Sequence, residues 1–134
     1  MLKKIGITLG IICLLVAIGF GVLVYRLVNM AHRIEGTLDK TAIVSLAKVA
    51  DGTYAGSYGD FLNTVSLEVT VKKHKIVKIT IIDQHSGSGY EALATVDRII
   101  KAQSPKVDAV TGASSSSRVI MIAVNKALEK GGRK

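Results

Sequence analysis

The sequence has few of the residues from which disulfides, metal centres and aromatic recognition surfaces are built. Its 134 residues include one cysteine, one proline, three histidines and no tryptophan, and aromatic residues make up 4%. The single cysteine, Cys13, cannot form a disulfide within the chain. Neither a His-x-x-x-His nor a paired-cysteine spacing occurs, so we expect no metal site. No Gly-Lys-Ser/Thr motif is present, which excludes a phosphate-binding loop of the nucleoside triphosphatase type.

Acidic residues are also in the minority. The chain has 10 Asp+Glu against 18 Lys+Arg, a formal net charge of +8. Nucleic acid is one partner for such a charge, but the longest basic cluster, residues 72–75, is short and aromatic residues are scarce. We therefore expect a solvated turn at this cluster and no nucleic-acid partner. An adaptor that uses its basic surface to bind acidic partners or lipid headgroups is an alternative function.

One uncharged, apolar run stands out near the N-terminus. It extends from Ile5 to Tyr25 and is preceded by two lysines. As a helix, such a run is roughly 31 Å long, which matches a hydrocarbon core of about 30 Å. A signal peptide is the alternative, but its apolar region is usually about 7–15 residues and ends at small residues. Because Tyr25 and Arg26 close this run, the sequence favours an uncleaved transmembrane anchor over residues 1–25.

The orientation of the anchor follows from the charges that flank it. Lys3 and Lys4 favour a cytoplasmic N-terminus, whereas Arg26, Arg33 and Lys40 oppose it. The short tail before the apolar run favours an exported body. We therefore expect a single-pass protein of the cell membrane whose domain is extracytoplasmic.

The residues after the anchor are expected to form a helical stalk and then a domain. Apolar residues between Val28 and Leu46 recur loosely at helical spacing, which predicts a helical stalk or linker over residues 26–50. Asp51-Gly52 breaks this pattern, and the composition changes. The remaining residues, 51–134, are assigned to one domain.

Alternating residues predict an antiparallel sheet at the start of this domain. Residues 53–60 suit a short strand that runs into a turn. Val65–Val71 and Val77–Ile81 alternate apolar with polar residues, and the basic cluster 72–75 lies between them. The two runs therefore predict a hairpin with one buried face, in which Val77, Ile79 and Ile81 point inward.

Two helices are expected after the hairpin. Residues 90–103 carry an apolar stripe that includes Leu93 and Ile99, and Pro105 ends this pattern. A loop over residues 106–112 precedes a second helix, which starts near Ala113 and ends at Gly131-Gly132. The expected fold class is α+β: a small antiparallel sheet with helices packed on one face, preceded by one transmembrane helix.

The chemistry of the domain is concentrated in residues 108–117, Asp-Ala-Val-Thr-Gly-Ala-Ser-Ser-Ser-Ser. Small and hydroxyl residues at a helix start form an anion receptor, because the first-turn amides have no intrahelical partners and the dipole is positive there. Ordinary N-capping by the serines is an equally simple interpretation. A small serine hydrolase, with Ser114 or Ser116 as nucleophile, His85 as base and Asp108 as its orienting group, is a weaker alternative because no Gly-x-Ser-x-Gly elbow is present.

The same segment resembles the FMN-binding domain family, which includes the peripheral flavin subunits of sodium-pumping NADH:quinone reductase and of the related Rnf electron-transport complexes. The family motif Asp-x-x-(Ser/Thr)-Gly-Ala-Thr-x-(Ser/Thr)-Ser corresponds here to residues 108–117. The resemblance covers about residues 51–129 and includes the opening Gly52-Thr53-Tyr54-x-Gly56, the hairpin, and His85 before a glycine-rich loop. The sequence departs from the pattern at Ser114, where the family has threonine, and at His74, where it usually has glycine.

The resemblance implies a function and a set of binding residues. It implies a membrane-anchored FMN-binding electron-transfer protein, served by a flavin transferase and by membrane electron-transfer partners. The implied covalent site is Ser114, whose hydroxyl can form the phosphoester that the family forms through threonine. The implied FMN-binding residues are Thr111, Gly112, Ala113, Ser114, Ser116, Asp108, Tyr54 and His85.

Overall fold

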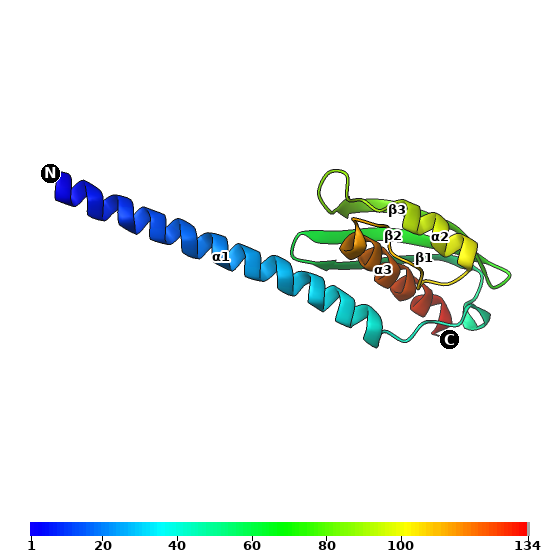
Figure 1. The fold of residues 1–134 in the computed structure, drawn as a ribbon. Coiled ribbons are helices and arrows are strands. Elements are labelled where there is room, and N and C mark those ends of the chain that lie inside the picture. The colour runs from blue at the N-terminus through cyan, green and yellow to red at the C-terminus, as the bar shows by residue number, and fades with distance from the viewer. Residues whose placement is uncertain (134) are drawn as a thin grey trace.

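The computed structural model describes residues 1–133 and consists of one long helix followed by a small α+β domain (Figure 1). The predicted fold class is confirmed: two helices pack against an antiparallel sheet, and one long apolar helix precedes them. The elements are α1 (Leu2–Lys40), the short 3-10 helix η1 (Leu46–Lys48), β1 (Gly52–Asp60), β2 (Asn63–Lys72), β3 (Lys75–His85), α2 (Ala94–Ala102) and α3 (Ser114–Gly132).

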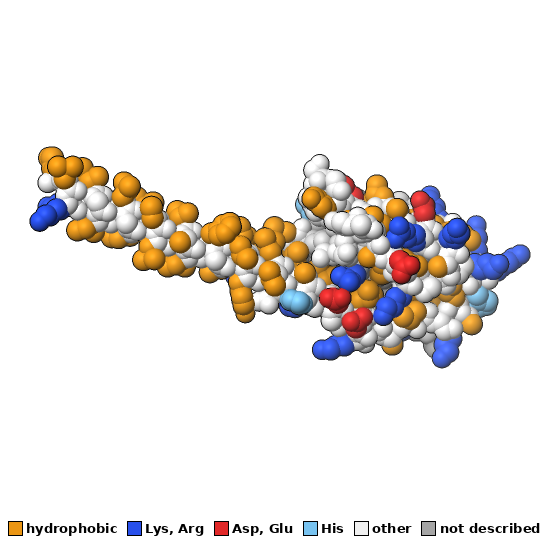
Figure 2. Space-filling model, in the orientation of Figure 1, with side chains coloured by type: hydrophobic (Ala, Val, Ile, Leu, Met, Phe, Trp, Pro, Cys, Tyr) orange, Lys and Arg blue, Asp and Glu red, His pale blue; other side chains and the backbone are white. Residues whose placement is uncertain are grey.

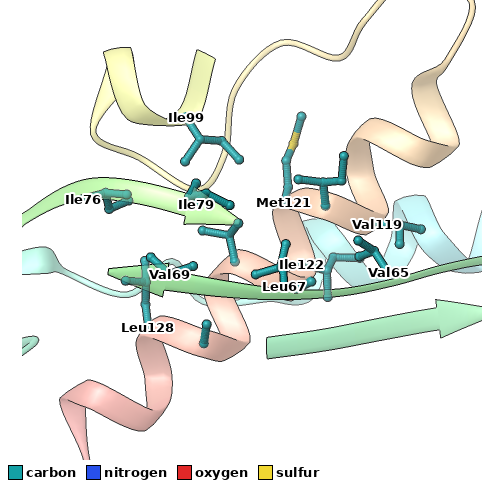
Figure 3. Close-up of a cluster of buried hydrophobic side chains, with 14 of the residues drawn as sticks. Val65, Leu67, Val69, Ile76, Ile79, Ile99, Val119, Met121, Ile122 and Leu128 are labelled. Atoms are coloured by element: carbon teal, nitrogen blue, oxygen red, sulfur yellow. The ribbon is translucent and has the colours of Figure 1, made fainter. Parts of the chain in front are cut away.

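The sheet is a three-stranded antiparallel meander in the order β1-β2-β3. Every second residue of the central strand β2 points into the core, because side chains alternate between the two faces of a strand. Its four inward residues from Val65 to Val71 are at most 2% exposed. They pack against α3, whose apolar side chains lie over the sheet (Figure 3).

The expected inward face of β3 is corrected at one position. Val77 was expected to point inward, yet it is 48% exposed, while its neighbour Ile76 is 1% exposed. The cause is a shift in register: Thr70 pairs with Lys78 but Val71 pairs with Ile76, so Val77 is the extra residue. Such a bulge moves the flanking side chain to the other face.

The first helix of the domain is shorter than predicted. It was expected over residues 90–103, but α2 starts at Ala94, and Tyr90 and Leu93 are both exposed. Ala92 adopts a left-handed conformation (φ 53°), which interrupts a right-handed helix. At the other end Gln103 is left-handed as well, and its side chain bonds to both backbone groups of Ile76 on β3.

In the predicted stalk or linker, residues 26–50, α1 continues from the apolar run and ends at Lys40. In α1 the side chains up to residue 28 are exposed, and hydrophobic side chains cover this part of the helix (Figure 2). Further along the helix, Ile34 and Leu38 are buried against the domain. The chain after Lys40 is extended and is held by the buried side chain of Asn125, which bonds to Val44 N and Ala42 O. α1 is long and apolar enough to cross a membrane, a property that signal sequences share.

Candidate functional site

A cleft of about 370 Å³ lies at the N-terminal end of α3. Three segments that are distant in sequence form it: the start of β2, the loop after β3, and the turn that leads into α3. Figure 1 shows these segments at the end of the domain from which α1 projects. The residues that line the cleft are Asn63, Ser86, Tyr90, Gly112, Ala113, Ser114, Ser115 and Ser116.

The turn into α3 leaves backbone amides unpaired. Gly112 is left-handed (φ 80°), and the N-cap position is occupied by Ala113, which has no side chain able to cap. The serines therefore lie inside the first turn, and ordinary N-capping is not their role here. No hydrogen bond from the amides of residues 114–116 is found within residues 1–133. Together with the helix dipole, these donors form a receptor for an anion.

Other side chains hold this turn from behind. The buried hydroxyl of Ser117 donates to Ala113 O (2.8 Å) and accepts from Val110 N (2.9 Å). Arg98 on α2 donates to the carbonyl oxygens of Asp108 and Ala109, each at 2.9 Å. The loop before α3 is thus fixed before any ligand binds, which reduces the entropy lost on binding.

Two buried polar atoms at the cleft have no partner. Asn63 is 5% exposed; its Nδ2 donates to Ser116 Oγ (3.2 Å), while its Oδ1 bonds to nothing among the described residues. The Oγ of Ser86 is buried and unpaired in the same way. Because buried polar atoms are rarely left unsatisfied, these two atoms indicate a site for a polar ligand.

The structure brings most of the predicted site residues together, with exceptions. Gly112, Ala113, Ser114 and Ser116 line the cleft, and Thr111 adjoins it. Asp108 is exposed and lies beside Arg98 and Lys106 in a neighbouring groove. The imidazole of His85 is exposed and lies 3.5 Å from the Asp83 carboxylate.

Tyr54 is separated from the rest. Its hydroxyl donates to Ala50 O (2.8 Å), and its ring lies against Gly131 at the C-terminal end of α3. Ser114 and Gly131 are 17 positions apart on the same helix, which corresponds to roughly 26 Å. The structure therefore gives Tyr54 a packing role at the opposite end of the domain from the cleft.

Sequence reasoning did not find three of the cleft residues: Asn63, Ser86 and Tyr90. Asn63 and Ser86 come together because β2 starts beside the residue at which β3 ends. The pairing of Thr64 with His85 sets this arrangement, and both residues lie outside the predicted hairpin strands Val65–Val71 and Val77–Ile81. Tyr90 was predicted to be the first residue of a helix, but it belongs to the loop before α2, so its place at the cleft had no sequence signal.

The arrangement does not support a serine hydrolase. His85 faces Asp83 rather than Asp108, and no hydrogen bond joins its ring to Ser114 or Ser116. Within residues 1–133, no group of three or more His, Cys, Asp or Glu side chains is placed to hold a metal ion. The chemistry that the cleft offers is binding of an anion by backbone amides and hydroxyls.

One ion pair lies beside the cleft, at the turn between β1 and β2. Arg33 on α1 donates twice to Asp60, at 2.6 and 2.8 Å. The hydrogen bond from Arg33 lowers the pKa of the Asp60 carboxyl below its ordinary value, and Asp60 in turn raises the pKa of Arg33. The pair joins the long helix to the turn that immediately precedes Asn63.

The fold and the cleft define a small α+β domain that binds an anionic ligand at a helix N-terminus. A model of the FMN-binding domain matches residues 60–129, which include the whole cleft. The chain belongs to the FMN-binding domain family, and its cofactor is FMN. The chain is also similar to a protein of Treponema pallidum (strain Nichols) described as uncharacterized, with 32% identity over 108 residues. This similarity covers 78% of the chain but 30% of that protein, so the chain spans about a third of its relative's length.

The cleft residues fit FMN. The unpaired amides of residues 114–116 suit its phosphate, and the open space in front of Gly112 leaves room for the phosphate to approach. The unpaired Asn63 Oδ1 suits a hydroxyl donor, which the ribityl chain of FMN provides. The exposed ring of Tyr90 offers an apolar face to a flat ring system.

Proposed function

We propose that this protein is a membrane-anchored electron-transfer protein that carries FMN on the outer face of the membrane. The observation that carries the proposal is the uncapped start of α3, which opens into a cleft with two unpaired buried polar atoms. FMN supplies one- and two-electron redox chemistry when bound, and the protein binds, orients and tunes it.

We assign a different part of FMN to each group of residues in the cleft. The amides of residues 114–116 would hold the phosphate, and Gly112 keeps the approach to them open. The unpaired Asn63 Oδ1 and Ser86 Oγ would form hydrogen bonds with the ribityl chain. The exposed ring of Tyr90 would pack beside the isoalloxazine ring.

Ser114 is the residue that we propose for covalent attachment. Its side chain is exposed at the cleft, whereas the hydroxyl of Ser116 accepts from Asn63 and that of Ser117 bonds to the loop backbone. A flavin transferase would join Ser114 Oγ to the FMN phosphate as a phosphoester. Asp108, exposed at the start of the same motif, is the candidate for recognition by that transferase.

The anchor is assigned to the first part of α1. Large residues, Tyr25 and Arg26, close the apolar run, whereas signal peptidase requires a site of small residues, and this supports an uncleaved span. Lys3 and Lys4 support a cytoplasmic N-terminus and therefore an outer domain. Electron donors and acceptors in the same membrane are the expected partners.

The test is the colour and redox behaviour of the full chain, purified in detergent. We expect the visible absorption of oxidised flavin, loss of this absorption on reduction by dithionite, and its return in air. A colourless protein that also fails to take up added FMN would overturn the proposal and favour the adaptor function.

A second experiment tests the orientation in the membrane. In intact spheroplasts, external protease should degrade the domain; full protection would reverse the proposed orientation.

A further inference from the structure

The two turns of the sheet have opposite chemistry. The β1–β2 turn consists of Phe61-Leu62, whereas the β2–β3 turn is Lys73-His74 between two further lysines. The ten residues of β2 separate the turns by roughly 33 Å. Figure 1 shows the β1–β2 turn on the side from which α1 projects and the β2–β3 turn at the far end.

The side chains of the apolar turn are exposed, and they bury little apolar area within the domain. Phe61 is 40% exposed and Leu62 is 56% exposed. Phe61 is left-handed (φ 53°), a conformation for which a two-residue turn normally uses asparagine or glycine. Neither residue belongs to the core, so neither packing nor local conformation accounts for two large apolar side chains here.

The position of the turn does account for them. The guanidinium of Arg26, the first residue after the apolar run, lies 5.8 Å from the centre of the Phe61 ring. About two turns further along α1, Arg33 forms hydrogen bonds with Asp60, the residue that precedes the turn. The turn therefore lies level with the end of the proposed span, where lipid headgroups begin.

The surroundings of the turn have the composition of a membrane interface. Tyr25 is exposed beside Arg26, and aromatic residues are enriched at this depth. Arg26 forms no ion pair within residues 1–133, and it lines a cleft of about 380 Å³ together with Tyr25 and Phe61. A cation at this depth is attracted to lipid phosphates.

We propose that the Phe61-Leu62 turn is a second membrane contact, inserted in the interfacial layer of the bilayer that α1 spans. The proposal rests on the anchor assigned under the proposed function. Two side chains are too few for a stable protein interface of about 800 Å² per partner. They are sufficient for a contact that the anchor already holds at the surface.

This contact fixes the orientation of the domain. A single helix leaves a domain free to rotate and tilt, whereas a second point of insertion removes much of that freedom. Asn63, the next residue after the turn, lines the FMN cleft, so the cleft is kept close to the membrane surface. The lysine turn at the opposite end of the sheet faces water.

The test compares the depths of three labels in the full chain, reconstituted in vesicles of phosphatidylcholine and phosphatidylglycerol that contain brominated lipid. The background is Cys13→Ser, which removes the only natural thiol. A fluorophore is attached at Leu62→Cys, at Lys73→Cys as the matched turn control, and at Val16→Cys in the span. We expect several-fold stronger quenching at positions 16 and 62 than at 73. Adding Phe61→Asn, which suits the left-handed backbone, should reduce quenching at position 62 without unfolding the domain.

The outcomes separate the inference from the proposal on which it rests. Quenching at 16 with equal, weak quenching at 62 and 73 would overturn the inference and leave the anchor intact. Absence of quenching at 16 would overturn the anchor itself, and the inference with it. Equal strong quenching at 62 and 73 would show that the domain lies flat on the bilayer, which also contradicts insertion by this turn.

Discussion

The two ends of α3 are built differently. At its N-terminal end, Gly112 has no atom within 4 Å of the position of a Cβ, Ser114 is exposed, and the first amides are unpaired. At its C-terminal end, a Cβ on Gly131 would lie 2.6 Å from the Tyr54 ring and 2.7 Å from Val49. Glycine therefore leaves space for a ligand at the N-terminal end of this helix and allows close packing at its C-terminal end.

The difference separates stability from binding. Close packing occurs in the middle of α3, where Gly56 of β1 lies against the backbone of Ala123, and at its C-terminal end, where Gly131 lies against the Tyr54 ring. These contacts fix the helix on the sheet. The N-terminal end can then remain open to a ligand without loss of the fold. We call the N-terminal end of α3, with its cleft, the open end, and the remainder of the helix, which packs closely on β1, the closed end. Changes at the closed end should reduce stability, and changes at the open end should reduce FMN binding.

The largest effect is expected from Gly56→Val. A Cβ at this position would lie 2.1 Å from Ala123 O and 2.9 Å from Ala127, both on α3, so the helix must move away from β1. We expect destabilisation of about 3 kcal/mol, the upper end of the usual range for overpacking. Thermal unfolding of the detergent-solubilised chain, followed by circular dichroism, measures it. Ala55→Val, on the exposed face of the same strand, is the control, and an equal effect of both variants would contradict the comparison.

Gly112→Val should affect binding most strongly. The left-handed backbone disfavours valine by about 1–2 kcal/mol, and its side chain enters the space through which the phosphate approaches. Loss of one hydrogen bond to a charged group, about 1.5–3 kcal/mol, weakens FMN affinity by roughly one to two orders of magnitude. Titration of the apoprotein with FMN measures the change. Lys73→Ala, in the distant turn, should bind normally, and equal small effects of the two variants would place the phosphate elsewhere.

The packing of α3 on the sheet was largely predictable from the sequence, because local patterns determine it. The alternation from Val65 to Val71 predicted the buried face of β2, and the apolar stripe of the last helix predicted its contact with the sheet. The pattern failed where a local irregularity overrode it. The bulge at Val77 and the left-handed Ala92 leave no trace in apolar periodicity.

The open end was predictable only in part. The serine turn is a contiguous motif, so its place at a helix start could be predicted. Asn63 and Tyr90 reach the cleft through pairing between strands and a loop conformation, neither of which periodicity encodes. Tyr54 was assigned to the site by resemblance of sequence position, and the structure places it with Gly131 instead.

A smaller effect on binding is expected from Ser114→Ala, which tests the chemistry of the open end. Without the hydroxyl no phosphoester can form at this position, so covalent flavin should be absent from this variant. Non-covalent affinity should fall by about 1.5 kcal/mol, the value of one hydrogen bond to a charged group. Ser115→Ala is the matched control, and Ser114→Thr should retain labelling. The measurement is flavin fluorescence on a denaturing gel after co-expression with a flavin transferase; fluorescence that persists in Ser114→Ala would assign attachment to another hydroxyl.

The smallest effect is expected from the Arg33–Asp60 ion pair, which joins α1 to the β1–β2 turn and in which Arg33 is exposed and Asp60 partly buried. The hydrogen bond from Arg33 lowers the pKa of Asp60 below its ordinary value of 3.8. The carboxylate therefore stabilises the folded state above that pH, and this contribution is lost as the pH falls through the lower pKa of the folded protein. Below about pH 4, loss of this contribution should lower the melting temperature of the wild-type protein. Asp60→Asn and Arg33→Gln should each make the melting temperature less dependent on pH in this range, because each abolishes the same interaction. The double variant should then match the single ones; additive losses would show that the two residues stabilise the molecule through separate contacts.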